Sequence, residues 1–128
     1  MDARAKRMVF NNLIANALRY SPTGSSLTIH VRQDEKFCNI DFIDQGFGFD
    51  NKELKRVFKK FYRVQNQETQ NIEGAGLGLY ISRQIIKSHK GKINVFSEGR
   101  GKGTRFMVSL PVDNTFAEEN QKSTSEVN

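Results

Sequence analysis

The sequence predicts an α+β domain, a two-layer α/β sandwich with helices on one face of a mixed, largely antiparallel sheet. Apolar residues recur at helical spacing near the N-terminus and alternate with polar residues in four short stretches. Short turns join neighbouring strands, which favours antiparallel pairing. The 128 residues suffice for one domain with its own core. A single cysteine, Cys38, excludes an internal disulfide framework.

The first half of the chain is predicted to form one helix and two strands. A helix over residues 2–19 carries an apolar stripe at spacings of three and four residues. The stripe consists of Phe10, Leu13, Ile14, Ala17 and Leu18. A Ser-Pro-Thr-Gly turn at 21–24 ends this helix. Alternation over 27–32 and again over 38–44, around a polar turn, predicts a hairpin.

The second half is predicted to form two helices and two further strands. Asp50 and Glu53 have the spacing of a capping box that opens a helix over 50–61. A second helix over 77–89 follows a glycine-rich segment and is closed by Gly91. Strands over 93–97 and 104–110 complete the domain. It is expected to span 1–112, with 113–128, which carries four acids and one lysine, as a disordered polar tail.

Asp44 ends the second strand and shares its parity with Ile40 and Phe42, so its carboxylate should leave the strand on the core side. Two interpretations stay open. Asp44 either starts an Asx turn in solvent or acts as an acceptor that reads a ligand. Gly46 and Gly48 favour the ligand, because glycine lets a ligand approach the backbone closely.

Asn12 and Asn16 lie four residues apart and share a helix face that Arg19 extends, with Tyr20 beside it. Asparagine is unfavourable inside a helix, so this face is either a polar surface or the lining of a cavity. The amide oxygen of asparagine is a hard ligand that suits Mg²⁺.

The segment 74–79, Gly-Ala-Gly-Leu-Gly-Leu, leads into the later helix. It is either a flexible cap or a phosphate site, because free N–H groups and the helix dipole favour an anion there. The dinucleotide fingerprint would need glycine in place of Leu79, and the chain contains no P-loop motif. Basic residues over 51–63 are interpreted mainly as a solvated helix face, with Arg63 as a candidate phosphate contact.

Together these segments resemble the conserved boxes of sensor histidine kinases. Residues 12–21 (Asn-Leu-Ile-Ala-Asn-Ala-Leu-Arg-Tyr-Ser) resemble the N box, 44–48 the G1 box, 57–63 the F box and 74–79 the G2 box. Gly103-Thr104-Arg105-Phe106 is similar to the final Gly-Thr-x-Phe strand. The resemblance covers roughly 2–111. It implies the catalytic ATP-binding domain of these kinases (HATPase_c, GHKL superfamily), with the Bergerat-type fold shared with gyrase, Hsp90 and MutL.

The resemblance also implies roles by motif position. Asn16 would coordinate Mg²⁺ with Asn12 beside it, and Asp44 would accept from the adenine amine. Asn12, Asn16 and Arg19 would be the catalytic residues. The stretch 64–73 would be a lid over the nucleotide, expected to be disordered without it. The ATP-binding residues would be Asn12, Asn16, Arg19, Tyr20, Asp44, Gly46, Gly48, Phe61, Arg63, Gly74, Gly76, Leu77, Gly78, Leu79 and Thr104.

The sequence fits three other functions less well. An ATPase clamp of the gyrase or MutL type uses a Glu one turn before the Mg²⁺ asparagine as general base, and Asn12 at that position cannot take a proton. A protein-serine kinase acting on an anti-sigma partner shares the fold, but the F box around Phe58 favours a histidine kinase. The only observation that supports a nucleic-acid-binding module is the net charge of +6.

The resemblance implies that this domain positions Mg-ATP for γ-phosphoryl transfer to a histidine on a separate dimerisation domain, with a response regulator downstream. We interpret the chain as an excised fragment without that domain and without the strand that usually opens the fold. It is expected to bind ATP but not to phosphorylate itself, because His30 lies on a strand and His89 at a helix end. We expect a cytoplasmic domain that contacts neither nucleic acid nor membrane, in a parent that can be anchored in the inner membrane.

Overall fold

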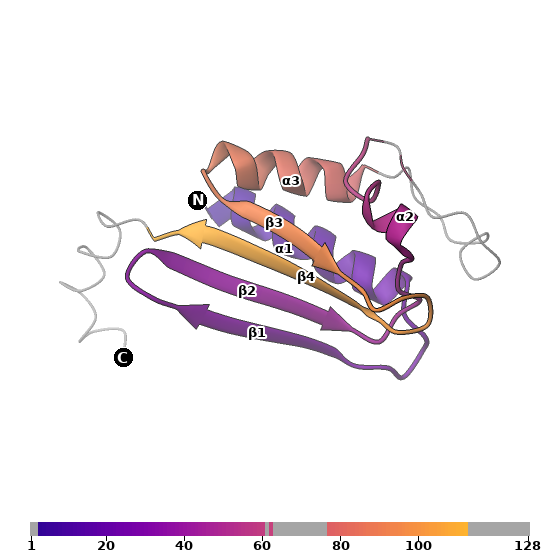
Figure 1. The fold of residues 1–128 in the computed structure, drawn as a ribbon. Coiled ribbons are helices and arrows are strands. Elements are labelled where there is room, and N and C mark those ends of the chain that lie inside the picture. The colour runs from indigo at the N-terminus through magenta and orange to yellow at the C-terminus, as the bar shows by residue number, and fades with distance from the viewer. Residues whose placement is uncertain (1–2, 61, 63–76, 113–128) are drawn as a thin grey trace.

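The computed structural model describes residues 3–60, 62 and 77–112. Within them it places three helices and four strands (Figure 1). In chain order these are α1 (Ala3–Arg19), β1 (Leu27–Gln33), β2 (Phe37–Asp44), α2 (Asn51–Leu54), α3 (Gly78–Ser88), β3 (Lys92–Phe96) and β4 (Thr104–Pro111). Among the described residues, no helix is both long enough and apolar enough to cross a bilayer.

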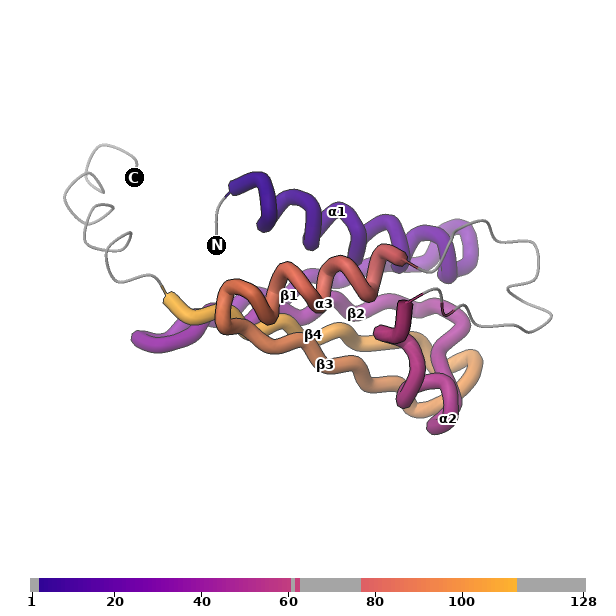
Figure 2. Tube along the Cα trace, turned by 90° about the horizontal axis from the view of Figure 1, so that it is seen from above, coloured from indigo at the N-terminus to yellow at the C-terminus, as the bar shows by residue number. Residues whose placement is uncertain are grey.

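The four strands form one sheet in the order β1-β2-β4-β3, and each neighbouring pair is antiparallel. α1 and α3 lie side by side on one face of this sheet (Figures 1 and 2). The predicted α+β sandwich is therefore confirmed. The parallel component of a mixed sheet is not found within the described part of the chain. Short loops reverse the chain between β1 and β2 and between β3 and β4, and β2 and β4, which are distant in sequence, also pair antiparallel.

The core lies between the helices and the sheet. Helical spacing brings Val9 and Leu13 of α1 and Ile86 of α3 onto the alternating inner face of β2 and β4. That inner face supplies Ile40, Phe42, Phe106, Val108 and Leu110. The predicted stripe of α1 is confirmed at Leu13 and Ala17 but is wrong at Leu18, which is 69% exposed. The helix is rotated so that Val9, rather than Leu18, joins the core.

The predicted helix over 50–61 is wrong beyond Leu54, where α2 ends. Further along, successive N–H groups donate to the carbonyl oxygen three residues earlier, which gives a chain of turns instead of an α-helix. The donors are Arg56, Lys59 and Tyr62. This tighter spacing allows the β-branched Val57 to be buried against the core while its basic neighbours stay exposed.

Gly91 closes α3 as predicted, because its N–H donates to the carbonyl oxygen of Ile86 at 2.9 Å. The residue with positive φ at this helix end is Lys90, at 62°. Gly91 is also needed for space. A Cβ atom there would lie 2.6 Å from the carbonyl oxygen of Ser109 on β4. The close approach of helix end and strand therefore requires glycine at this position.

The sheet face that points away from the helices carries a buried acid, Asp41. The Asp41 Oδ2 atom lies 2.6 Å from the Nη2 atom of Arg105 and 3.7 Å from that of Arg32. Both arginines come from neighbouring strands and cover the carboxylate, so its side chain is only 3% exposed. Asp41 and Asp44 thus lie on opposite faces of the same strand, because they are three residues apart.

Candidate functional site

Asp44 is buried at the end of β2, on the helix-facing side, as predicted. Its Oδ1 atom accepts hydrogen bonds from the N–H of Gly46 at 2.8 Å and of Thr104 at 3.2 Å. The bond from Gly46 forms the predicted Asx turn, but the turn is buried and does not lie in solvent. The alternative interpretation, that Asp44 reads a ligand, stays a prediction. Both hydrogen bonds that the described residues give this carboxylate end on Oδ1, which leaves Oδ2 for a ligand donor.

Burial raises the pKa of the Asp44 carboxyl, and the N–H donors of Gly46 and Thr104 lower it by less. Buried carboxyl groups with a shifted pKa are common at functional sites, so Asp44 is a candidate functional group. An added donor, such as an amine on a ligand, would stabilise the ionised carboxylate.

Gly46 brings the loop after β2 against the C-terminal end of α1. A Cβ atom at Gly46 would lie 2.6 Å from the carbonyl oxygen of Tyr20, 2.8 Å from Asp44 Oδ1 and 2.9 Å from Ser21 Oγ. The N–H of Phe47 donates to the same Tyr20 carbonyl at 3.0 Å. The structure therefore brings together Tyr20, Asp44 and Gly46, which the sequence had placed at one site from segments 24 residues apart.

Ser21 adds an unexpected polar atom to this corner. Its Oγ is the only buried side-chain nitrogen or oxygen within the described residues that has no hydrogen-bond partner. Buried hydroxyls are nearly always paired in native proteins, because an orphan costs about 1–3 kcal/mol. An orphan hydroxyl beside a carboxylate with a free oxygen fits a site that takes up a polar ring such as adenine.

The asparagine pair lies along α1, leading away from Asp44. Asn12 and Asn16 are both half-buried, and Arg19 is exposed at the helix end. Asn12 Nδ2 donates to Ser82 Oγ at 3.3 Å and, at 3.5 Å, to the carbonyl oxygen of Gly78, so it joins α1 to the start of α3. Asn12 also lines an open depression of about 500 Å³ together with Arg4, Arg7, Met8 and Asn11. This depression lies toward the N-terminal end of α1 and includes neither Asn16 nor Asp44, so the cavity lining predicted for the asparagine pair stays a prediction.

The start of α3 contributes Leu77, Gly78 and Leu79. Leu77 is the N-cap residue and makes no side-chain capping bond, so first-turn N–H groups of the helix remain for an anion. Leu79 packs against the core and fixes the helix at this point. The predicted contacts Phe61, Arg63, Gly74 and Gly76, and the proposed lid over 64–73, lie outside the described residues.

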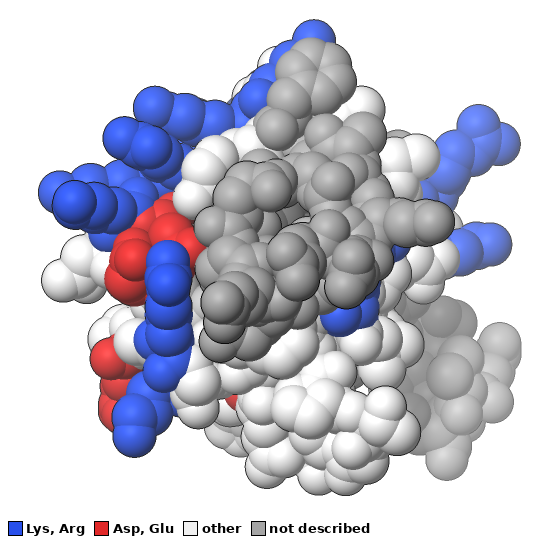
Figure 3. Space-filling model, turned by 90° about the vertical axis from the view of Figure 1, so that its right-hand side faces the viewer, with Lys and Arg blue, Asp and Glu red and all other residues white. Residues whose placement is uncertain are grey.

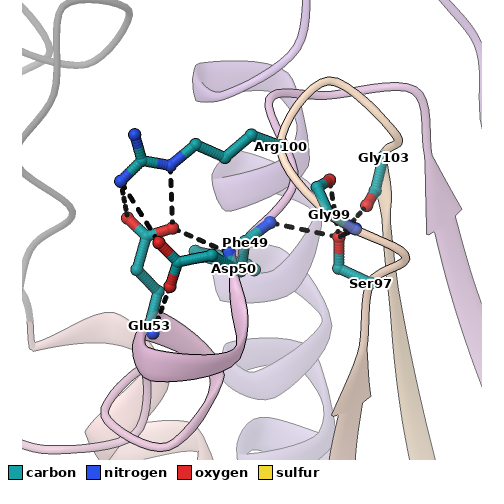
Figure 4. Close-up of polar contacts among 7 residues, drawn as sticks. All are labelled: Phe49, Asp50, Glu53, Ser97, Gly99, Arg100 and Gly103. Carbon is teal, nitrogen blue, oxygen red and sulfur yellow. Dashed lines mark hydrogen bonds and ion pairs between the residues drawn. The ribbon is translucent and has the colours of Figure 1, made fainter.

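A second loop, between β3 and β4, lies against the loop that follows Asp44 (Figure 4). Ser97 Oγ accepts from the N–H of Phe49 at 3.1 Å and contacts the carbonyl oxygens of Gly99 and Gly103 at 3.1 and 2.7 Å. Arg100, from the same loop, pairs with the capping box of α2 through Asp50 and Glu53, both at 3.4 Å. The capping box itself is confirmed by its two reciprocal hydrogen bonds of 2.8 Å.

The basic residues after Asp50 are exposed, as predicted for a solvated face. Lys and Arg side chains gather along one side of this end of the molecule, next to a group of Asp and Glu side chains (Figure 3). No cluster of three His, Cys, Asp or Glu side chains that could bind a metal occurs among the residues placed by the structure. Asparagine oxygens such as that of Asn16, completed by ligand phosphates, suit Mg²⁺, which commonly keeps few protein ligands.

Sequence reasoning missed Ser21, Ser97 and Arg100. Ser21 directly follows Tyr20 in the N box, so its position was a usable signal. Ser97 and Arg100 had no comparable signal, because a serine at a strand end and an arginine in a glycine-rich loop are ordinary surface features. Only the packing of the two loops assigns them to the site.

Comparison with known proteins gives consistent matches. A family model described as "Histidine kinase-, DNA gyrase B-, and HSP90-like ATPase" matches residues 1–114. Sensor histidine kinase WalK of Bacillus subtilis is 40% identical over 105 residues, which cover 80% of this chain and 17% of WalK. The chain spans about a fifth of the length of the curated relatives it matches.

Solved structures share the fold. The mycobacterial sensor histidine kinase MprB superposes with a TM-score of 0.75 at 28% identity, covering 87% of this chain and 72% of that one. Full-length ShkA, solved in complex with AMPPNP, superposes with a TM-score of 0.67 at 26% identity. The match covers 84% of this chain and 21% of ShkA.

Proposed function

This chain belongs to the family of histidine kinase-, DNA gyrase B- and HSP90-like ATPases, and from that premise we propose that it positions Mg-ATP for γ-phosphoryl transfer to a histidine on a separate dimerisation domain. Within the family it corresponds to the catalytic ATPase domain of two-component sensor histidine kinases. The observation that carries the proposal is Asp44, a buried carboxylate with one oxygen held by backbone N–H groups and one left for a ligand.

The proposed roles come from the family resemblance, and the burial and contacts of the described side chains support them. Asp44 Oδ2 accepts from the amine of adenine, and Tyr20 and Gly46 border the base. Asn16 would hold Mg²⁺ through its amide oxygen, and the ion would neutralise phosphate charge. Arg19, at the helix end, and the first-turn N–H groups of α3 face the phosphates. Asn12 holds α3 through Ser82 and, lacking a basic oxygen, does not activate water, which favours transfer over hydrolysis.

The partners and location are part of this proposal. The acceptor histidine lies on a helical dimerisation domain of the parent kinase, and a response regulator takes the phosphoryl group afterwards. The domain works in the cytoplasm, where ATP is supplied, and contacts neither nucleic acid nor membrane.

The test is phosphotransfer in trans. The chain is mixed with a dimerisation domain from its parent kinase and with γ-labelled ATP, and acid-labile phosphate is followed on each protein. We expect label on the dimerisation domain and none on this chain alone, because a histidine must meet the γ-phosphate in line at about 3–3.5 Å. His89 is held by a 2.7 Å contact between Nδ1 and the Ile85 carbonyl oxygen, and His30 lies within β1. Label on either histidine in the isolated chain would contradict the proposal.

Replacing Asn16 with Ala is expected to remove the increase in ATP affinity that Mg²⁺ produces. Alanine offers no oxygen ligand, whereas helix propensity at this position improves, so the fold should persist. Calorimetry with ATP, with and without Mg²⁺, measures the difference. Asn11→Ala is the matched control, since Asn11 is an exposed asparagine of the same helix. An equal Mg²⁺ effect in Asn16→Ala and wild type would refute the ligand assignment.

A further inference from the structure

Three hydrogen bonds from backbone N–H groups connect the β3–β4 loop, residues 97–103, and the first residue of β4 to Asp44 and the loop that follows it. The N–H of Thr104 donates to Asp44 Oδ1 at 3.2 Å, that of Gly103 to the Gly46 carbonyl at 3.2 Å, and that of Gly101 to the Phe47 carbonyl at 2.6 Å. Two of the donors, Gly101 and Gly103, lie in the β3–β4 loop, and the third, Thr104, begins β4. The position of the carboxylate therefore depends on a segment that is about 60 residues away in the chain.

Ser97 holds the β3–β4 loop in the shape that presents these donors. Its hydroxyl has one hydrogen, and the shorter contact assigns it to the Gly103 carbonyl at 2.7 Å, next to Thr104. The same oxygen accepts from the N–H groups of Phe49 at 3.1 Å and Gly99 at 3.3 Å. One side chain thus connects both loops, and because Ser97 is buried, no bulk water replaces it when it is removed.

The β3–β4 loop and the loop after Asp44 pack so closely that neither can shift without moving the other. A Cβ atom at Gly103 would lie 2.3 Å from the carbonyl oxygen of Asp44, and one at Gly48 would lie 2.2 Å from that of Gly99. Backbone meets backbone directly at both places. A shift of the β3–β4 loop is therefore transmitted to Asp44 rather than absorbed by flexible side chains.

Arg100, in the same loop, forms ion pairs with the capping box of α2. Its Nε lies 3.4 Å from Glu53 Oε1 and its Nη2 lies 3.4 Å from Asp50 Oδ2 (Figure 4). The Glu53 side chain is only 8% exposed and fixed by the capping box, so the loop is tied to a rigid turn. The arginine itself is half exposed, which makes this tie sensitive to salt.

We propose that Ser97 is a positioning residue for base recognition: together with Arg100 it holds the β3–β4 loop so that Asp44 meets the amine of adenine. This proposal rests on the proposed function, since it assigns a task to residues around the same nucleotide site. Ser97 and Arg100 act through Asp44 and do not touch the nucleotide themselves. Their removal should weaken the choice of base more than the binding of phosphates.

The test compares ADP with inosine diphosphate, which carries a carbonyl oxygen where adenine carries its amine. Calorimetry gives both affinities for wild type, Ser97→Ala and the control Ser109→Ala, whose serine lies on the open face of the sheet. We expect the preference for ADP over inosine diphosphate to fall by about fivefold in Ser97→Ala, as for loss of one hydrogen bond, and to stay unchanged in the control. A variant that is merely less stable weakens both ligands equally, so this ratio does not move with stability.

Arg100→Gln provides the second variant, because a half-exposed side chain is replaced and the fold should persist. At low salt we expect a fall of about twofold in the same ratio, and at high salt no difference from wild type. A wild type that prefers ADP, together with an unchanged ratio in every folded variant of this pair, overturns the positioning role. A wild type that binds both nucleotides equally overturns base reading by Asp44 instead.

Discussion

Replacing Asp44 with Asn is expected to lower ATP affinity by roughly 5- to 150-fold while leaving the free domain at least as stable as wild type. The amide can still accept from the N–H groups of Gly46 and Thr104 at one atom. Its other atom is then an NH₂ group, a donor that faces the donor amine of adenine. The pairing that reads the base is lost, and a buried polar group is left unpaired.

The effect on stability has the opposite direction. Burial raises the pKa of Asp44 above its unfolded value, so the ionised carboxylate costs stability once the pH exceeds the pKa of the folded state. At neutral pH the Asn variant lacks this cost. This cost builds up as the pH rises from the unfolded pKa through the folded pKa, so the difference should disappear once the pH falls below the unfolded pKa, where the carboxyl is protonated in both states.

Calorimetry for ATP and thermal unfolding of the free domain at neutral and acidic pH measure both effects. Asp34→Asn is a suitable control, because Asp34 also accepts backbone N–H groups but is exposed in the β1–β2 turn. Those donors lower the pKa of Asp34, so its Asn variant should lose stability at neutral pH. Undiminished ATP affinity in Asp44→Asn would remove Asp44 from the site.

The second large effect is expected for Gly48→Ala, which should lower the free energy of unfolding by about 2–5 kcal/mol. Gly48 has a φ of 68°, a region that costs alanine about 1–2 kcal/mol. A Cβ atom would also lie 2.2 Å from the carbonyl oxygen of Gly99 and 2.9 Å from Ser97 Oγ. The two loops would have to separate, at a cost typical of overpacking, and nucleotide binding should weaken with them.

Gly101→Ala separates these two causes. Gly101 has a φ of 79°, close to that of Gly48, but nothing lies within 4 Å of where its Cβ would be. It should therefore lose only the backbone contribution, about 1–2 kcal/mol. Urea unfolding of both variants gives the difference. Equal losses would show that the contact between the loops does not contribute to stability.

The sequence predicted the parts of the site that depend on local pattern. Strand parity placed Asp44 inside, the spacing of Asn12 and Asn16 placed them on one helix face, and the capping box at Asp50 was correct, because each of these depends on residues a few positions apart. It also predicted α1 and α3 to within one or two residues.

The sequence predictions that were wrong or incomplete concern residues whose environment is set by segments distant in the chain. Leu18 fits the helical stripe as well as Leu13 does, and only the placement of the sheet leaves it exposed. The helix after Asp50 has a helical apolar pattern up to 61, but burial of Val57 is achieved by turns. Gly91 caps α3 as predicted, but the close approach of β4, which also requires glycine there, has no signal in the local pattern. Ser97 became part of the site only through contacts with Phe49 and Gly103, one of which is 48 residues away.

Asp41 takes no part in the proposed chemistry. It disfavours a shift in the pairing register of β2, the strand that carries Asp44. If β2 paired with its neighbours one residue out of step, every side chain would change faces. Asp41 would then lie beneath α1 without Arg105 or Arg32, and Asp44 would point into solvent. An unpaired buried carboxylate costs several kcal/mol, a large part of the stability of a domain of this size. A charge on the open face thus selects, during folding, the one alignment in which the nucleotide site exists.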